Sequence, residues 1–263
     1  MTSLFQINNK PLEYVGNWSF SSLKDFEECK LRFALSKIHR LPKPVLPPDN
    51  PLERGTRIHD NLEKFVKGES ESFLNNEARA IKDFEDGLFH LRELYQDGKA
   101  TAEQDWLFDE DWNLTFKNAQ HAAKIGYDDV DPESITPIWL WTKLDFAVTC
   151  EDTGHVIVGD YKSGKSAYKE MEHMQQLQIY AAVAALKYEW ADRITAELWY
   201  VDEGHVKPME LTREQALKYV GRFDRRARAI YDERVFKPNP HERNCRFCPF
   251  GKNKGTGACP VAV

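Results

Sequence analysis

The sequence predicts an α/β protein in which helices pack around one mixed β-sheet. Apolar and polar residues alternate in segments 137–149 and 156–162, which is the pattern of half-buried strands. Segments 171–188 and 212–235 instead have helical periodicity, and the apolar run 195–201 between them is typical of a third strand. This order of strand, strand, helix, strand and helix favours a single α/β domain over two separate ones.

The composition is that of a globular, mildly acidic protein. The chain has 263 residues, 41% of them apolar and 30% charged, which suffices for a sizeable core. Its formal net charge of −6 argues against non-specific binding of nucleic acid, although a locally basic groove is compatible with it. No run approaches the roughly 20 apolar residues that span a bilayer, and MTSLFQINNK lacks the layout of a signal peptide. We therefore expect a cytoplasmic protein without a membrane contact.

The first part of the chain is predicted to be helical with one extended connection. Residues 1–17 have weak patterning and are expected to form an arm. Residues 19–38 have the periodicity of a helix, for which Ser22 is the expected N-cap. Five prolines within 41–51 predict an extended connection.

Two further helices and a pair of strands are expected next. A helix over 53–68 should end at Gly68, because glycine accepts the left-handed conformation that often follows a helix. A third, more exposed helix is predicted over 73–98. Segment 102–116 alternates loosely and predicts a strand pair at an edge of the sheet.

The centre of the chain reads as a β-hairpin. In segment 137–149, alternation predicts that one face carries six residues: Ile138, Leu140, Thr142, Leu144, Phe146 and Val148. The turn is expected at EDTGH, with Gly154 in it. In the returning strand, Val156, Val158, Asp160 and Lys162 should share a face.

The expected domain organisation follows from these elements. The arm 1–17 precedes one domain over 18–235, whose last helix is opened by Thr212. The tail 236–263 has little periodicity and contains three cysteines, and we expect it to pack on the same domain.

Two aspartates on the predicted hairpin are the first indication of chemistry. Asp145 and Asp160 lie near the ends of the paired strands, so pairing across the turn brings their carboxylates close together. Such carboxylates repel each other unless a proton or a cation intervenes, and oxygen ligands suit Mg²⁺ or Mn²⁺. Lys162 would then lie where a water or a phosphate is held, as metal-assisted phosphodiester hydrolysis requires. The alternative is an exposed ion pair of Asp160 with Lys162 at a strand end.

Short motifs occur in a fixed order around these residues. They are Gly55-Thr56-Arg57-Ile58-His59, then Asp145, then Asp160-Tyr161-Lys162-Ser163-Gly164, then Gln176 with Tyr180. In this order they resemble the PD-(D/E)xK nuclease superfamily, and more closely the RecB/AddB-type nucleases and their CRISPR-associated iron–sulfur relatives. The resemblance covers roughly residues 18–260. It implies a restriction-endonuclease-like core, which is a central mixed β-sheet flanked by helices.

The resemblance also implies a role for each matched residue. His59, Asp145, Asp160 and the Tyr161 carbonyl would bind a Mg²⁺ or Mn²⁺ ion. Lys162 would be the catalytic lysine. Without the other motifs, His59 beside an apolar helix face would read as a histidine at the edge of the core.

Four more residues are weaker candidates. Gln176 and Tyr180, one turn apart on a helix face, would orient the lysine or contact the DNA backbone. The alternative for this pair is an amphipathic helix with a packed tyrosine. Glu103 is a candidate additional acid on the preceding strand, and Glu63, one turn after His59, is a weaker candidate.

The cysteines predict either a metal site or plain packing. Five cysteines in a reducing compartment make a disulfide framework improbable, and three of them fall within the last nineteen residues. By ligand chemistry, His241 with the three C-terminal cysteines would suit zinc. The resemblance implies instead a [4Fe–4S] cluster that joins the two ends of the chain, and its ligands would be Cys29, Cys245, Cys248 and Cys259. Cys150 is expected to be a plain strand residue.

The expected function is metal-dependent hydrolysis of DNA. The resemblance implies an exonuclease that acts on DNA ends or single strands in recombination or repair, with a recombinase or helicase as a candidate partner. The alternatives are a nuclease-like module that binds DNA without cleavage, and an endonuclease. The sequence contains no G-x-x-x-x-G-K-[ST] loop, so it does not encode a helicase motor.

Overall fold

The computed structural model describes residues 16–74, 76–166 and 170–261, to which all structural statements below refer. Most of the predicted arm, residues 1–15, therefore lies outside the described residues. No helix within these ranges is long and apolar enough to cross a membrane.

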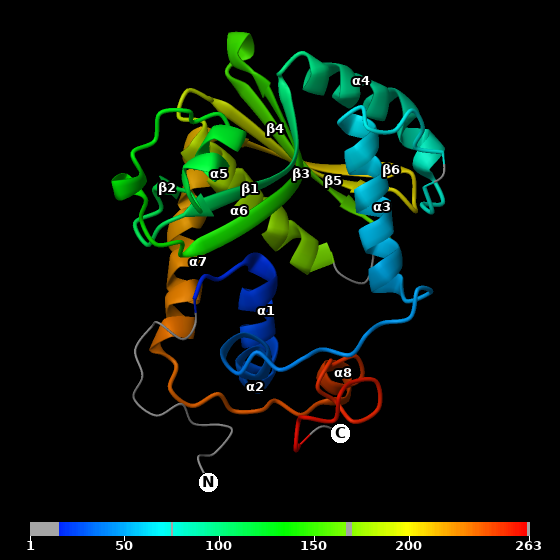
Figure 1. The fold of residues 1–263 in the computed structure, drawn as a ribbon, viewed down its shortest axis with the longest axis vertical. Coiled ribbons are helices and arrows are strands. Elements are labelled where there is room, and N and C mark those ends of the chain that lie inside the picture. Colours follow the sequence, from blue (N-terminus) through cyan, green and yellow to red (C-terminus); the bar gives the residue numbers. More distant parts are fainter. Residues whose placement is uncertain (1–15, 75, 167–169, 262–263) are drawn as a thin grey trace.

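The described residues form one six-stranded sheet in the order β2-β1-β3-β4-β5-β6 (Figure 1). Neighbouring strands pair antiparallel except β4 and β5, which are parallel, so the sheet is mixed as predicted. The strands are β1 Ala100–Phe108, β2 Leu114–Thr115, β3 Leu140–Cys150, β4 His155–Lys162, β5 Arg193–Tyr200 and β6 His205–Thr212.

Helices cover both faces of this sheet (Figure 1). One face packs against α1, α6 and α7, and the other packs against α3 and α4. The helices are α1 Phe20–Glu28, α2 Lys30–Phe33, α3 Pro51–Val66, α4 Glu85–Gln96, α5 Ala119–Lys124, α6 Glu170–Lys187, α7 Arg213–Asp232 and α8 Glu242–Cys245.

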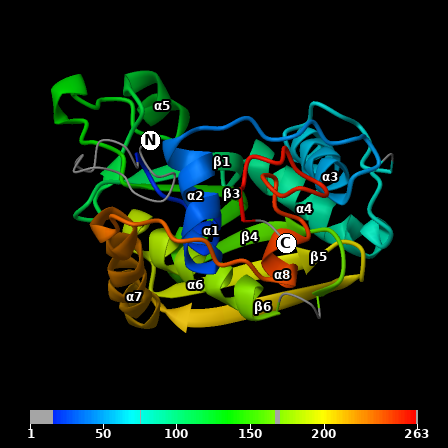
Figure 2. The same ribbon diagram turned by 90° about the horizontal axis from the view of Figure 1, so that it is seen from below.

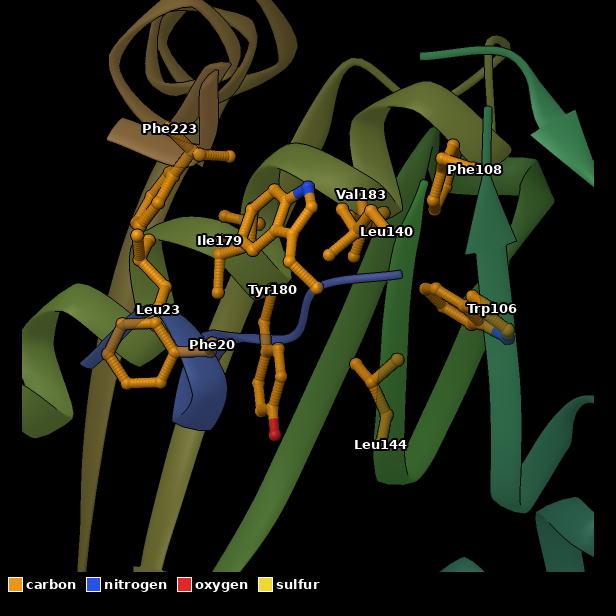
Figure 3. Packing of buried hydrophobic residues seen from close by; sticks show 14 of the residues in the cluster. Phe20, Leu23, Trp106, Phe108, Leu140, Leu144, Ile179, Tyr180, Val183 and Phe223 are labelled. Carbon is orange, nitrogen blue, oxygen red and sulfur yellow. The ribbon is translucent and has the colours of Figure 1, made fainter. Parts of the chain in front are cut away.

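The larger hydrophobic core lies between the sheet and α6, α7 and α1. Figure 3 shows Tyr180 of α6 among the buried side chains of Phe20, Leu23 and Phe223, with its hydroxyl directed away from them. Burial of each large apolar side chain contributes about 1.5–3 kcal/mol. This packing fixes α6 against the strands that carry the two aspartates.

The central hairpin departs from the predicted alternation. Leu140 and Leu144 lie in the core beneath α6, whereas Phe146 and Val148 lie in the second core, beneath α3 and α4. The faces exchange where Glu103 of β1 lies opposite Asp145 of β3. The ladder is interrupted at these two residues, but its register continues, because Ala102 pairs with Phe146 and Gln104 with Leu144. Glu103 has a φ of +52°, which a regular strand residue does not adopt. The prediction that all six alternating residues share a face was therefore wrong.

The first predicted helix is also different in the structure. Its N-cap is Ser19, not Ser22, because Ser19 and Ser22 form a reciprocal capping box. The helix breaks at Cys29, whose φ of −159° and ψ of 102° are extended. It resumes as α2 and ends in the π-helical segment Ala34–Ile38.

Two other elements were mispredicted. The expected helix over 73–98 is shorter, and consists of a 3-10 turn at Ile81–Phe84 followed by α4. The polar strand β6 was missed, since it lies at the edge of the sheet and contains Pro208, which edge strands tolerate. The hairpin turn at Gly154 and the Thr212 cap of α7 form where they were predicted.

Candidate active site

The two aspartates lie where β3 and β4 separate. Phe146 pairs with Gly159, and the ladder stops before the next pair, Asp145 and Asp160. The Tyr161 amide donates instead to Asp145 Oδ2, which replaces the missing ladder bond. A Cβ on Gly159 would lie 1.9 Å from the Phe146 ring, so only glycine fits beside the site. Both aspartates are buried, as a strand position requires.

His59 reaches this point from α3, and Glu103 reaches it from β1, where it lies opposite Asp145. His59 Nδ1 lies 2.9 Å from Asp145 Oδ1 and 3.9 Å from Glu103 Oε1. Donor atoms of the three residues lie within 4.8 Å of one another. Glu103 is held in the left-handed region, a strained conformation that functional sites often contain. Its acidic side chain on the neighbouring strand was the only signal for it in the sequence.

Gly55, the first residue of the G-x-x-x-H motif, explains how α3 comes so close to the loop after Lys162. A Cβ on Gly55 would lie 3.3 Å from the Ser163 hydroxyl, in the loop that follows Lys162. The small residue therefore lets the helix approach this loop, and His59 lies one turn further on. Glu63, the next residue on that face, pairs with Lys67 and does not join the group of donor atoms.

Burial and close charges shift the pKa values of these groups. Burial alone would lower the pKa of His59, but the hydrogen bond and charge of Asp145 raise it to about 9. Burial and the charge of Asp145 raise the pKa of Glu103 to about 7. Burial also raises the pKa of Asp160, whereas His59 overcomes the effect of burial at Asp145 and lowers its pKa. Clusters of ionisable groups with shifted pKa values are common at functional sites.

Asp160 is held by side chains from α6. Its Oδ1 lies 3.1 Å from Gln176 Nε2 and 3.0 Å from the Tyr180 hydroxyl. Its Oδ2 is buried and pairs with the Lys162 ammonium, whose nitrogen lies 2.5 Å away. Gln176 and Tyr180 thus hydrogen-bond to the carboxylate, not to Lys162, which the sequence interpretation had offered as their target.

This set of donors fits a divalent cation. Two carboxylates and an imidazole converge, and the carboxylate of Asp160 lies beside Asp145 across the hairpin. Oxygen-rich sites suit Mg²⁺ and Mn²⁺, and Mn²⁺ also accepts an imidazole. The amide of Tyr161 points to Asp145, so Tyr161 contributes backbone to this site while its ring is buried in the second core.

A buried ion pair supports the loop after Lys162, and sequence reasoning missed it. Asp202 accepts two hydrogen bonds from Arg54, at 2.8 and 2.7 Å, and further ones from the amides of Gly164 and Arg79. These bonds lower the pKa of Asp202 to about 2 even though burial opposes the shift. Arg54 directly precedes the G-x-x-x-H motif, but nothing in the sequence indicated its distant partner.

The cysteines of the two chain ends line one cavity. Cys29, Cys245, Cys248 and Cys259 all contribute to its wall. The extended break at Cys29 places its sulfur 3.5 Å from the Asn239 amide of the tail. Cys248 and Cys259 are anchored beside Leu31 and Phe250.

The spacing of these sulfurs bears on the choice of metal. A tetrahedral zinc site with bonds of about 2.3 Å holds its sulfurs about 3.8 Å apart. Within the described ranges, no three cysteine sulfurs lie within 4.8 Å of one another. His241 accepts from the Arg243 amide and lines a neighbouring groove, not the cysteine cavity. The four cysteines therefore share one cavity, which His241 does not line.

The comparison with protein families identifies the class. A profile of the PD-(D/E)XK nuclease superfamily matches residues 17–252, so the chain belongs to this superfamily, as the motifs predicted. The family implies a nuclease that uses a divalent metal ion, with DNA as the expected substrate. A solved structure titled "Crystal structure of SSO0001" superposes with a TM-score of 0.33 and 13% identity, over 78% of this chain and 96% of that one. The search of curated proteins found no match.

Proposed function

We propose that the protein is a Mg²⁺- or Mn²⁺-dependent exonuclease that degrades DNA from ends or along single strands in recombination or repair. The observation that carries this proposal is the convergence of His59, Glu103 and Asp145 opposite the Asp160–Lys162 pair. The RecB/AddB-type motif order supports the finer assignment.

Each group has a definite part in this proposal. His59, Glu103, Asp145 and Asp160 would hold the cation, which supplies Lewis acidity and lowers the pKa of a bound water. Lys162 would stabilise the attacking water or the scissile phosphate, and Asp160 keeps its ammonium at the site. Gln176 and Tyr180 would keep the Asp160 carboxylate in position through their hydrogen bonds.

Cleavage of labelled DNA tests this proposal. The wild type should degrade end-labelled linear DNA only with Mg²⁺ or Mn²⁺, whereas Asp160→Asn and Lys162→Ala should lose nearly all activity. Survival of covalently closed circular DNA would support an exonuclease, and its cleavage would indicate an endonuclease. Binding without cleavage of any substrate would favour the alternative of a DNA-binding module and would overturn the enzymatic proposal.

We further propose that Cys29, Cys245, Cys248 and Cys259 hold a [4Fe–4S] cluster. The cavity that all four cysteines line supports it, since His241, the further ligand of the zinc alternative, does not line this cavity. The cluster would fasten the tail 236–263 to the domain 18–235 by closing a loop of more than 200 residues between Cys29 and Cys245. Protein purified without oxygen should absorb broadly near 400 nm and contain iron. A colourless protein with stoichiometric zinc would refute the cluster.

The proposed setting also follows the family resemblance. We place the protein in the cytoplasm, where a recombinase or helicase would supply the DNA ends on which it acts. Co-purification from native cells, with and without nuclease treatment of the lysate, would separate a protein partner from one tethered only through DNA.

A further inference from the structure

Two adjoining hollows lie between the candidate active site and the cysteine-bearing tail. The pocket beside Lys162 is bounded by Glu172, and Glu172 also lines the adjoining groove. The far wall of that groove is formed by α8 and the residues after it, up to Phe247. Figure 2 shows α8 next to α1 and the start of α6, which form the other walls. A linear ligand bound at the active site therefore has a path towards Phe247.

Phe247 is the most exposed phenylalanine or tryptophan among the described residues. It is 69% exposed, although the nearby Cys248 and Phe250 are buried. Two cations lie over its ring, with the Arg246 guanidinium 5.3 Å and the Lys254 ammonium 4.9 Å from the ring centroid. The anchored neighbours hold the ring at the groove, where a stacked base would take the place of a cation on the ring face.

The charge of the groove favours a polyanion. Two of its acids are already neutralised, because Glu172 pairs with Lys24 and Glu28 pairs with Arg32. One further acid, Glu242, lies in the wall. The cations that remain are Arg243 and Arg246 in the wall and Lys254 above Phe247. Locally, positive charge therefore exceeds negative charge in a chain whose net charge is −6.

An exposed aromatic ring flanked by cations matches the chemistry of unpaired nucleotides. Aromatic rings stack on free base faces, and arginine and lysine pair with the adjoining phosphates. In a duplex the base faces are covered by their neighbours, so only a single strand or a frayed end offers one. We propose that this groove binds single-stranded DNA, with one base stacked on Phe247 and the flanking phosphates paired with Arg246 and Lys254. This inference rests on the proposed nuclease function and names the path of its substrate.

The test measures binding, not cleavage. All variants are made in a Lys162→Ala background, and the affinity for fluorescent single-stranded and hairpin-duplex DNA is measured by anisotropy in Mg²⁺. Phe247→Ala should weaken single-strand binding roughly ten-fold and change duplex binding little. Phe247→Trp should retain the affinity. Arg246→Gln and Lys254→Gln should each reduce the salt dependence of single-strand binding by about one phosphate contact.

Phe89→Ala is the matched control, because Phe89 is 45% exposed and lies on α4, which is not part of the groove. The absorbance near 400 nm and the thermal midpoint of each variant show whether the tail has kept its structure. Unchanged single-strand affinity in folded Phe247→Ala would overturn the inference, as would an equal loss for single-stranded and duplex DNA.

The two proposals fail in different ways. Suppose that the wild type, which keeps Lys162, cleaves DNA, but that Phe247→Ala in the Lys162→Ala background binds single strands normally. The inference is then wrong and the nuclease assignment stands. If no cleavage occurs but single-strand binding still depends on Phe247, the enzymatic assignment is wrong and the groove assignment stands. If neither DNA form binds, the groove has another occupant, such as an acidic protein, and the inference fails.

Discussion

Replacing Tyr180 with phenylalanine removes one hydroxyl and leaves the packed ring in place. That hydroxyl lies 3.0 Å from Asp160 Oδ1, 3.1 Å from the Lys143 carbonyl and 2.7 Å from Gln176 Nε2. A hydrogen bond to a charged group contributes about 1.5–3 kcal/mol. Because Tyr180 is buried, water cannot replace the lost donor.

This loss should appear in metal binding as well as in folding. Groups that orient metal ligands typically contribute roughly 10- to 100-fold to affinity or activity. Tyr180→Phe should therefore weaken Mn²⁺ binding by about that factor in isothermal titration calorimetry, and raise the Mg²⁺ concentration needed for half-maximal cleavage in parallel. The free energy of unfolding should fall by no more than about 1.5–3 kcal/mol, because the ring still fills its site.

Tyr231→Phe is the matched control for this experiment. Tyr231 is also buried, and its hydroxyl bonds to the Gly16 carbonyl at 2.8 Å, away from the candidate site. It should lose a similar amount of stability without any change in metal affinity. If folded Tyr180→Phe binds Mn²⁺ as tightly as the wild type, the hydroxyl does not position Asp160 and the reasoning is refuted.

Three further predictions follow from particular contacts. First, the pKa of about 9 keeps His59 protonated near neutral pH, so Mn²⁺ binding should release about one proton more in the wild type than in His59→Ala. Calorimetry in buffers of different ionisation enthalpy measures the number of protons released. Equal release from the two proteins would remove His59 from the ligand set. Second, Gly159→Ala should lower the free energy of unfolding by at least about 1–3 kcal/mol, because the alanine Cβ would overlap the Phe146 ring. Urea unfolding measures this loss, and an unfolding midpoint equal to that of the wild type would contradict the packing described. Third, the pKa of Asp202 is lowered to about 2, so its stabilising contribution of about 2 kcal/mol is complete above the unfolded pKa of about 3.9 and is lost as the pH falls through 2. Asp202→Asn should therefore be less stable at neutral pH but nearly equal to the wild type near pH 2, and an equal deficit at both pH values would show that the charge is not responsible.

Much of the fold was readable because the determining signals are local. The strands β4 and β5 and the helices α3, α6 and α7 form within a few residues of their predicted ranges. Their periodicity, the glycine of the hairpin turn and the Thr212 cap each act within a few residues. The order of the elements was then enough to predict a mixed sheet with helices on both faces.

The errors arose where distant residues decide the outcome. The faces of β3 exchange at Asp145, where the ladder to β1 is interrupted opposite Glu103, and alternation within β3 cannot reveal this interruption. Similarly, the helix break at Cys29 faces a tail more than 200 residues away in the chain. β6 was missed because an edge strand buries too little to need an apolar pattern.

The sequence by itself determined which chemistry is available: two acids and a lysine on one hairpin, a histidine on a helix, and cysteines at both ends. The motif order also determined the superfamily, because motif spacing is a property of the chain alone. Only the tertiary structure decided that Glu103 joins His59 and Asp145, and that Gln176 and Tyr180 bond to Asp160. It also decided that the pocket beside Lys162 adjoins, at Glu172, the groove that Phe247 lines. The reason is geometric: donor distances depend on how the sheet twists and where the helices pack, and both follow from contacts between residues far apart in the chain.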